Sequence, residues 1–272
     1  MRLAYQGEPG AYSEAASLLY SPHAETLPCK TFDDVFDAVV HKRATHGVVP
    51  MENSIGGTIH RNYDLLVDHE IPITGEVELD VVHCLQALPG TKLSDVKTVY
   101  SHPQALAQCE RYLKDLGATV EAVYDTAGGA KLVAEQKLQG AAALASRRAA
   151  EVFGLEVLQE AVQDFEYNIT RFFVIGGTPP AEANKTTIVF ALPSTPGSLF
   201  KALSVFALRD INLSKLESRP IRGRPWEYLF YVDIESRRDD LPLARALTQL
   251  GEFAKWIRVL GTYKGWERKP AT

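Results

Sequence analysis

The segment GGTPPAEAN, residues 176–184, separates two blocks of different pattern in this sequence. Glycines and prolines interrupt regular structure, so we interpret the segment as a linker. Before it, short apolar strands alternate with amphipathic helices, which is typical of an α/β fold with a largely parallel sheet. After it, the expected order is strand, helix, strand, strand, helix, strand, a ferredoxin-like βαββαβ unit. The sequence therefore predicts two domains, residues 1–177 and residues 185–265.

The first block contains five expected strands and at least one clear amphipathic helix. In the helix, Leu106, Cys109, Leu113 and Leu116 recur at three- and four-residue intervals within residues 104–116. A long apolar-rich stretch, residues 71–88, is expected to carry the chain from one lobe to a second and to form a hinge. The expected strands are residues 3–6, 47–50, 98–100, 120–124 and 141–145.

The second block is expected to form the small ferredoxin-like unit, of about 80 residues. A βαββαβ unit leaves one sheet face or edge without helices, so we expect pairing with a second copy as a homodimer or homotetramer. The expected strands are residues 185–193, 211–221, 226–235 and 256–263, and the expected helices are residues 197–209 and 241–254.

Composition narrows the class of protein. The 272 residues are 46% hydrophobic and 23% charged, which is ordinary for a globular protein. The net charge of −5 and the lack of a basic block argue against a nucleic-acid partner. We see no signal peptide and no apolar run near the ~20 residues that span a bilayer. These features predict a cytoplasmic location and no membrane partner.

Metal and cofactor signals are also weak. The three cysteines lack C-x-x-C spacing, and the seven histidines lack H-x-x-x-H spacing, so we expect buried free thiols and no metal site. Neither a dinucleotide fingerprint nor a P-loop occurs, which predicts that no nucleotide cofactor is bound.

The hexapeptide NITRFF, residues 168–173, places the hydroxyl of Thr170 beside the guanidinium of Arg171 where an apolar strand begins. Neighbours on a strand point to opposite faces, but at a frayed first residue both can reach one cleft. A guanidinium grips a carboxylate by two parallel hydrogen bonds, and a neutral hydroxyl donates to a leaving oxygen without repelling an anion. Taken alone, the run also fits an ordinary edge strand.

Four strand-to-helix junctions share one chemistry: residues 6–13, 50–58, 101–104 and 125–130. Each places small or polar residues where the free N–H groups of a helix start would point. In a parallel sheet all four lie beyond the carboxyl ends of the strands, where ligands bind. Singly, Ser101 and Thr126 fit simple helix caps. Together, four helix starts suit a compact dianion.

These motifs resemble the prephenate dehydratase family and its sister activity, arogenate dehydratase, over nearly the whole chain. The second block resembles the ACT regulatory domain through residues 196–200 (PGSLF) and 217–220 (ESRP). The motifs of the first block that carry the resemblance are residues 5–7 (YQG), 10–14 (GAYSE), 52–54 (ENS), 101–106 (SHPQAL), 108–109 (QC), 125–127 (DTA), and Asn168 with residues 170–172 (TRF).

The resemblance implies a two-lobed catalytic domain, like a type 2 periplasmic-binding-protein fold, with the active site between the lobes. It implies a carbon–oxygen lyase that removes water and carbon dioxide, giving phenylpyruvate from prephenate or phenylalanine from arogenate. It also implies an ACT domain that binds L-phenylalanine across a subunit interface. A non-enzymatic two-lobed solute sensor is an alternative from another class.

The site residues expected on this basis fall into three groups. We assign catalysis to Thr170 and Arg171. Substrate binding is assigned to Asn53, Ser54, Ser101, Gln104, Thr126 and Phe172. Binding of the phenylalanine effector is assigned to Gly197, Ser198, Leu199, Asn212, Glu217, Ser218 and Arg219. The sequence leaves open the choice between prephenate and arogenate, the oligomer size and the strength of regulation.

Overall fold

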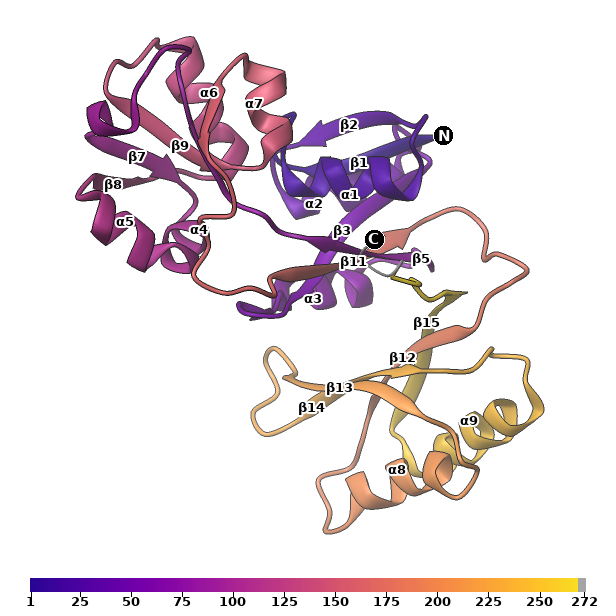
Figure 1. The fold of residues 1–272 in the computed structure, drawn as a ribbon. Helices are drawn as coiled ribbons and strands as arrows, with labels where there is room; N and C mark the ends of the chain where they lie inside the picture. Colours follow the sequence, from indigo (N-terminus) through magenta and orange to yellow (C-terminus); the bar gives the residue numbers. More distant parts are fainter. Residues whose placement is uncertain (269–272) are drawn as a thin grey trace. The chain divides into compact units, whose positions relative to one another are not determined.

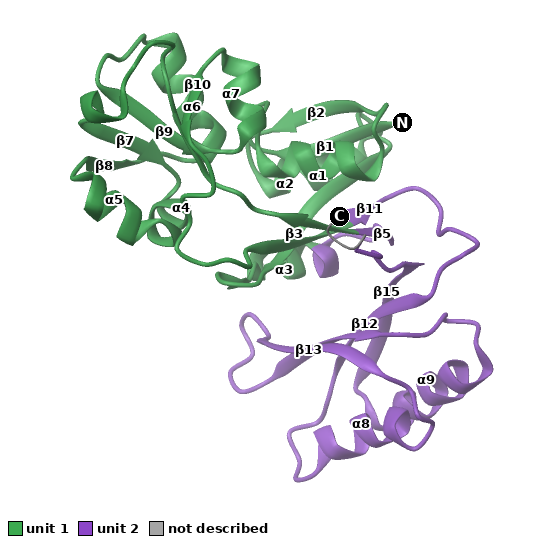
Figure 2. Cartoon of the chain, in the orientation of Figure 1, with its two compact units in different colours: residues 1–65, 77–173 green, residues 66–76, 174–272 purple. Residues whose placement is uncertain are grey.

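The computed structural model describes residues 1–268, which form two compact units (Figures 1 and 2). Unit 1 comprises residues 1–65 and 77–173, and unit 2 comprises residues 66–76 and the chain from Val174 onward. The chain passes from one unit to the other within three elements, α3 (His60–Asp68), β5 (Ile73–Asp80) and β11 (Ile169–Ile175).

Unit 1 has two lobes, and the first is built around strand β1 (Arg2–Gln6). This strand pairs in parallel with both β2 (Glu25–Cys29) and β3 (His46–Asn53). The order continues from β3 to β11 and then β5. The apolar run of β1 is fully buried because helices α1 (Tyr12–Tyr20) and α2 (Phe32–Val40) pack against this sheet.

The second lobe has a five-stranded sheet in the order β10-β6-β9-β7-β8. Its central strand β9 (Ala141–Ala145) is AAALA and wholly buried, and its small side chains allow α6 (Thr126–Glu135) to pack closely on it. The chain enters this lobe through residues 81–83, inside the predicted connection, and returns to the first lobe along β11. The two-lobed α/β fold predicted for this block is therefore confirmed. The lobe's other elements are β6 (Cys84–Ala87), β7 (Thr98–Ser101), β8 (Thr119–Ala122), β10 (Glu156–Gln159), α4 (Pro103–Gln108), α5 (Glu110–Leu116), α7 (Arg147–Phe153) and the 3₁₀ turn η1 (Leu93–Asp95).

The single helix expected over residues 104–116 is instead two helices, α4 and α5, which meet at Cys109. The backbone carbonyl of Gln108 accepts a hydrogen bond from the N–H of Asp164, 2.7 Å away, and is thereby withdrawn from the helical ladder. This partner lies far along the chain, so the apolar spacing gave no sign of the break. The start of α1 was expected from the junction at residues 6–13, whereas β2 and α2 were not predicted.

Unit 2 contains an antiparallel sheet in the order β13-β14-β12-β15, with α8 and α9 packed on one face of it (Figure 1). The predicted βαββαβ order is confirmed, and each predicted element overlaps an observed one. Within this unit β15 also pairs in parallel with Ile73 and Gly75 at the start of β5. The elements of this unit are β12 (Lys185–Ala191), α8 (Ser198–Ala207), β13 (Leu213–Pro220), β14 (Tyr228–Ile234), α9 (Leu241–Phe253) and β15 (Trp256–Lys264). One further short strand, β4 (Gly57–Thr58), belongs to unit 1 and pairs with β3.

Candidate active site

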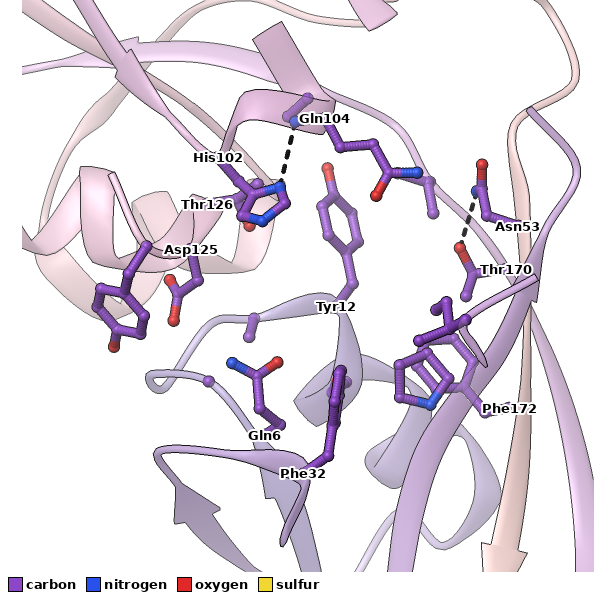
Figure 3. A pocket seen from close by; sticks show the side chains of 18 of the residues that line it. Gln6, Tyr12, Phe32, Asn53, His102, Gln104, Asp125, Thr126, Thr170 and Phe172 are labelled. Carbon is purple, nitrogen blue, oxygen red and sulfur yellow. Dashed lines mark hydrogen bonds between the residues drawn. The ribbon is translucent and has the colours of Figure 1, made fainter. Parts of the chain in front are cut away.

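A cavity of about 410 Å³ lies between the two lobes of unit 1, and all four predicted junctions contribute to its wall (Figure 3). Other parts of the wall come from residues 31–33 at the start of α2, from the crossover residues Val81 and His83, and from Thr170 and Phe172 on β11. The side chains used below that line it are Tyr12, Asn53, His83, His102, Gln104, Gln108, Asp125, Thr126, Thr170 and Phe172.

Asn53 fixes the position of the Thr170 hydroxyl. The amide oxygen of Asn53 accepts hydrogen bonds from the backbone N–H groups of Ile55 (3.1 Å) and Gly56 (2.7 Å), so its NH₂ group must point the other way. That group donates to Oγ1 of Thr170 at 3.0 Å and to Oδ1 of Asn168 at 2.7 Å. Because the Thr170 oxygen already accepts from Asn53, its own proton is left to donate into the cavity.

A buried chain of hydrogen bonds extends from this pair. Asn168 donates to Oε1 of Gln108 at 2.9 Å, and Gln108 donates back to Oδ1 of Asn53 at 3.3 Å. Nε2 of His83 lies 2.9 Å from the same Oε1, and its Nδ1 lies 2.9 Å from the hydroxyl of Tyr12. Burial lowers the pKa of His83, opposed by the bond to Gln108. A neutral imidazole with its proton on Nε2 therefore fits the bond to Gln108. The Tyr12 hydroxyl also lies 2.8 Å from the carbonyl of Val82, so its single proton is shared between that oxygen and Nδ1 of His83.

The helix starts around the cavity are not equivalent. Thr31 caps α2, His102 caps α4 through Nδ1 (3.2 Å from the N–H of Gln104), and Asp125 caps α6 by accepting from Gly128. Helix α1 begins after Ala11 and has no side-chain cap. Its first residues line the cavity, so its N–H groups are available to a ligand. Of the four predicted helix starts, those of α4 and α6 are therefore already capped by side chains, whereas that of α1 is not.

Five of the eight predicted catalytic and substrate-binding residues line the cavity: Asn53, Gln104, Thr126, Thr170 and Phe172. Ser54 instead ties its loop to β11, since its hydroxyl accepts from the N–H of Ile169 at 3.0 Å. Ser101 is fully buried, and its hydroxyl donates to the carbonyl of Leu144 at 2.6 Å. Ser101 therefore ends β7, and the predicted helix cap at this position is wrong because His102 takes that place.

Arg171 does not line the cavity. Strand β11 begins at Ile169, so Thr170 and Phe172 lie on the cavity side, and Arg171 shares the opposite side with Phe173. The guanidinium carbon of Arg171 lies 4.7 Å from the centre of the Phe173 ring. The prediction that Thr170 and Arg171 both reach one cleft from a frayed first residue is wrong. Strand β11 begins at Ile169, before the apolar run, so the two side chains point to opposite faces.

The predicted effector residues lie in three places within unit 2. Gly197 precedes α8 with φ of 76°, followed by Ser198, whose hydroxyl is 2.7 Å from that of Thr195, and by the partly exposed Leu199. Asn212 donates to Oε2 of Glu235 at 2.6 Å. The remaining three, Glu217, Ser218 and Arg219, follow one another on β13.

Three further findings concern metal ions, membranes and thiols. Among residues 1–268, no group of three or more histidine, cysteine, aspartate or glutamate side chains is placed to hold a metal ion. In the same residues no helix has the length and apolar character to cross a bilayer. Cys29, Cys84 and Cys109 are buried free thiols, as predicted.

Comparison with known proteins decides the family. A model of the family described as prephenate dehydratase matches residues 3–180, and a model of the ACT domain matches residues 186–252. The chain belongs to the prephenate dehydratase family. A relative named arogenate dehydratase/prephenate dehydratase 2, chloroplastic, from Arabidopsis thaliana is 49% identical over 97% of this chain and 72% of its own length.

Two solved structures extend the similarity to the fold. A prephenate dehydratase from Arthrobacter aurescens, described as in complex with L-Phe, matches with a TM-score of 0.89, 31% identity and coverage of 100% of this chain and 92% of its own. A protein described as GqqA, a novel type of quorum quenching acylases, matches with a TM-score of 0.91, 36% identity and coverage of 98% of each chain. Prephenate dehydratases are lyases, so the predicted enzyme class is confirmed.

The predicted cytoplasmic location is contradicted by these comparisons. Several plant members of the prephenate dehydratase family that match this chain are named chloroplastic. Buried free thiols do not distinguish one reducing compartment from another, so the cysteine pattern had no power to separate the two.

The cavity residues missed by the site prediction include Tyr12, His83, Gln108 and Asp125. Tyr12, Gln108 and Asp125 lie in motifs that carry the resemblance to prephenate dehydratases, and this was the signal available for them. His83 was considered only as a metal ligand. Its hydrogen-bond partners Tyr12 and Gln108 lie 71 and 25 residues away, so no local pattern could reveal the cluster.

Proposed function

We propose that this chain catalyses the decarboxylating dehydration of prephenate to phenylpyruvate in L-phenylalanine biosynthesis, with the interlobe cavity as its active site. The observation that carries the proposal is the Asn53–Thr170 hydrogen bond, which aims a neutral hydroxyl proton into the cavity. No cofactor enters the proposed reaction.

The reaction needs orientation and one proton. As the ring carboxylate leaves as carbon dioxide, its bonding electron pair moves into the ring, and the bond from the opposite ring carbon to its hydroxyl breaks. The hydroxyl takes a proton and departs as water, and the product gains an aromatic ring. In this proposal Thr170 donates to the departing hydroxyl. A threonine hydroxyl is a weak acid, so its proton is replaced from solvent or a neighbouring group in the same cycle.

The substrate's carboxylates need donors. The uncapped start of α1 supports a carboxylate site there, because its N–H groups and positive dipole end favour an anion. Gln104, Thr126 and Phe172 are proposed to orient the rest of the substrate. The carboxylate-binding role of Arg171 stays a prediction; it requires the guanidinium to leave the Phe173 ring when substrate binds.

Arogenate is the second candidate substrate, because relatives at 45–49% identity carry arogenate dehydratase in their names. Arogenate differs from prephenate by an amino group in place of the side-chain keto group, so the same elimination yields phenylalanine directly. Thr170 would have the same role with either substrate.

We further propose a catalytic domain over residues 1–177 and an ACT domain over residues 185–265, whose paired copies in a homo-oligomer bind L-phenylalanine. The bound L-Phe named for the Arthrobacter relative supports this effector. The exposed Leu216 on β13 supports pairing through this strand. Ser198, Leu199, Asn212, Glu217, Ser218 and Arg219 are the proposed effector contacts.

Regulation can be tested at Gly197, whose φ of 76° disfavours a β-branched side chain although nothing lies within 4 Å of an added Cβ. Gly197→Val is expected to abolish inhibition by phenylalanine while kcat is retained. Gly251→Ala, in the open space on α9, is the matched control and should respond like the unmodified protein. Full inhibition of Gly197→Val would place the effector site elsewhere.

The activity itself is tested by incubating the purified full chain with prephenate and following the absorbance of phenylpyruvate. We expect enzyme-dependent product formation. If neither prephenate nor arogenate is consumed, the proposed function fails and the solute-sensor alternative is favoured.

A further inference from the structure

Asp125 is a nearly buried carboxylate, 8% exposed, in the wall of the cavity. One of its oxygens accepts from the N–H of Gly128, and the other accepts from the N–H of Glu8 at 3.2 Å. A carboxylate has about four acceptor positions, so two backbone donors leave capacity for a ligand. Within the described part of the chain, no ion pair includes Asp125.

The other charged groups described around Asp125 do not form an ion pair with it. Burial lowers the pKa of His102, and the charge of Asp125, which raises it, has the smaller effect. Lys131 forms an ion pair with Glu8 at 3.1 Å, and Glu8 is chiefly responsible for raising the pKa of Lys131. The other carboxylate of the cavity wall, Asp33, is paired with Arg61. The described residues that line the cavity include no lysine and no arginine. The buried charge of Asp125 is therefore complemented best by a cationic group on the ligand.

Asp125 also lies beside the uncapped start of α1. A methyl group added at Gly7 would be 3.0 Å from Cβ of Ala11, the residue before α1, and 3.4 Å from Oδ2 of Asp125. Asp125 and the first residues of α1 therefore both lie close to Gly7 and line the same cavity. This juxtaposition matches an α-amino acid, in which a carboxylate and an ammonium are attached to one carbon.

We propose that Asp125 binds the α-ammonium group of arogenate and so makes this chain select an α-amino acid over the corresponding α-keto acid. The inference rests on the proposed function and specifies its substrate. Asp125 and Thr170 lie on opposite sides of the cavity (Figure 3). The amino-acid end of the substrate binds at Asp125 and α1, and the ring hydroxyl faces Thr170. The keto oxygen of prephenate would instead meet a carboxylate without a donor between them.

The test removes the charge and keeps the helix cap. Asparagine and serine cap helices about as well as aspartate, so Asp125→Asn and Asp125→Ser both preserve the start of α6. With the full chain, kcat/KM is measured for arogenate, as phenylalanine formed, and for prephenate, as phenylpyruvate formed. We expect the arogenate-to-prephenate ratio to fall about 10- to 100-fold in both variants, the weight of one charged hydrogen bond.

Asp34→Asn is the matched control, because it removes a carboxylate from the start of α2 and this residue is outside the cavity wall. The arogenate-to-prephenate ratio of kcat/KM for Asp34→Asn should equal that of the unmodified chain. In the unmodified chain, arogenate should be the better substrate. An unchanged ratio in both Asp125 variants, or equal losses on both substrates, would show that Asp125 only caps α6 and would overturn the inference. Turnover of prephenate alone would also overturn it while leaving the proposed function intact; turnover of neither would overturn the proposed function.

Discussion

Replacing Asn53 by aspartate changes one NH₂ group to an oxygen and tests how the Thr170 hydroxyl is oriented. The new oxygen would lie near three acceptors: Oδ1 of Asn168 at 2.7 Å, Oγ1 of Thr170 at 3.0 Å and the carbonyl of Ile169 at 3.3 Å. The Thr170 proton would then turn toward the introduced carboxylate to relieve the repulsion, and it would no longer be available to the leaving hydroxyl.

The expected magnitude follows from the lost contacts. The buried bond to Asn168 is replaced by an acceptor–acceptor contact and a carboxylate is buried, so the free energy of unfolding should fall by about 2–4 kcal/mol at neutral pH. Loss of the positioned donor should lower kcat by about 10²- to 10³-fold. Burial beside acceptors raises the pKa of the new carboxyl, and its protonated form regains one donor. Both kcat relative to the unmodified enzyme and the stability should therefore recover as pH falls.

The assay is the pH dependence of kcat on prephenate from pH 5 to 9, with stability measured by denaturant unfolding at each pH. Asn62→Asp is a control on the same side of the lobe, since the Asn62 amide bonds the carbonyl of Pro50 and lies outside the cavity wall. It should lose stability and keep most of its turnover. A kcat for Asn53→Asp within threefold of the unmodified enzyme at pH 7.5 would refute this account of the hydroxyl.

Three other substitutions test the lobe contacts and the arginine. Gly10→Ala should lower the free energy of unfolding by about 2–4 kcal/mol in denaturant titrations. The reason is that Gly10 has φ of +89° and an added Cβ would lie 2.7 Å from Cα of Ala149. An unchanged free energy of unfolding would contradict this packing. Glu14→Gln should lower the free energy of unfolding by about 1–3 kcal/mol, since the buried Glu14 carboxylate accepts from Arg148 at 2.9 Å and from the N–H of Gly10 at 2.8 Å. The control is the exposed ion pair of Arg2 and Glu25, where Glu25→Gln should leave the free energy of unfolding nearly unchanged. Arg171→Lys should raise KM if the guanidinium turns into the cavity with substrate, whereas an unchanged KM would assign the carboxylate to α1 alone.

Local patterns predicted the features that depend on neighbouring residues. The apolar run at 141–145 coincides with β9, and the alternation of strands and helices after the linker gave the order of unit 2. The junctions were predicted because parallel strands end at one edge of a sheet, whatever the details of each turn. The family resemblance added the reaction, which no pattern of spacing contained.

Features that depend on distant partners were not predictable in this way. Arg171 was misplaced because hydrogen bonding to neighbouring strands extends β11 back to Ile169, beyond the apolar run. The break at Cys109 depends on Asp164, and the environment of His83 depends on Tyr12 and Gln108. No role was predicted for Asp125, whose position as the cap of α6 and beside Gly7 and the start of α1 depends on the folded structure.

The most direct test of the account is kcat on prephenate for Thr170→Val, a change that keeps the side-chain shape and removes the hydroxyl. The unmodified enzyme and Thr170→Ser, which retains a hydroxyl, are measured beside it, with thermal unfolding and phenylalanine binding as checks of folding. We predict a fall in kcat of about 10²- to 10⁴-fold for valine and a smaller fall for serine. A folded Thr170→Val enzyme with kcat within threefold of the unmodified chain would remove Thr170 from the mechanism and contradict the account.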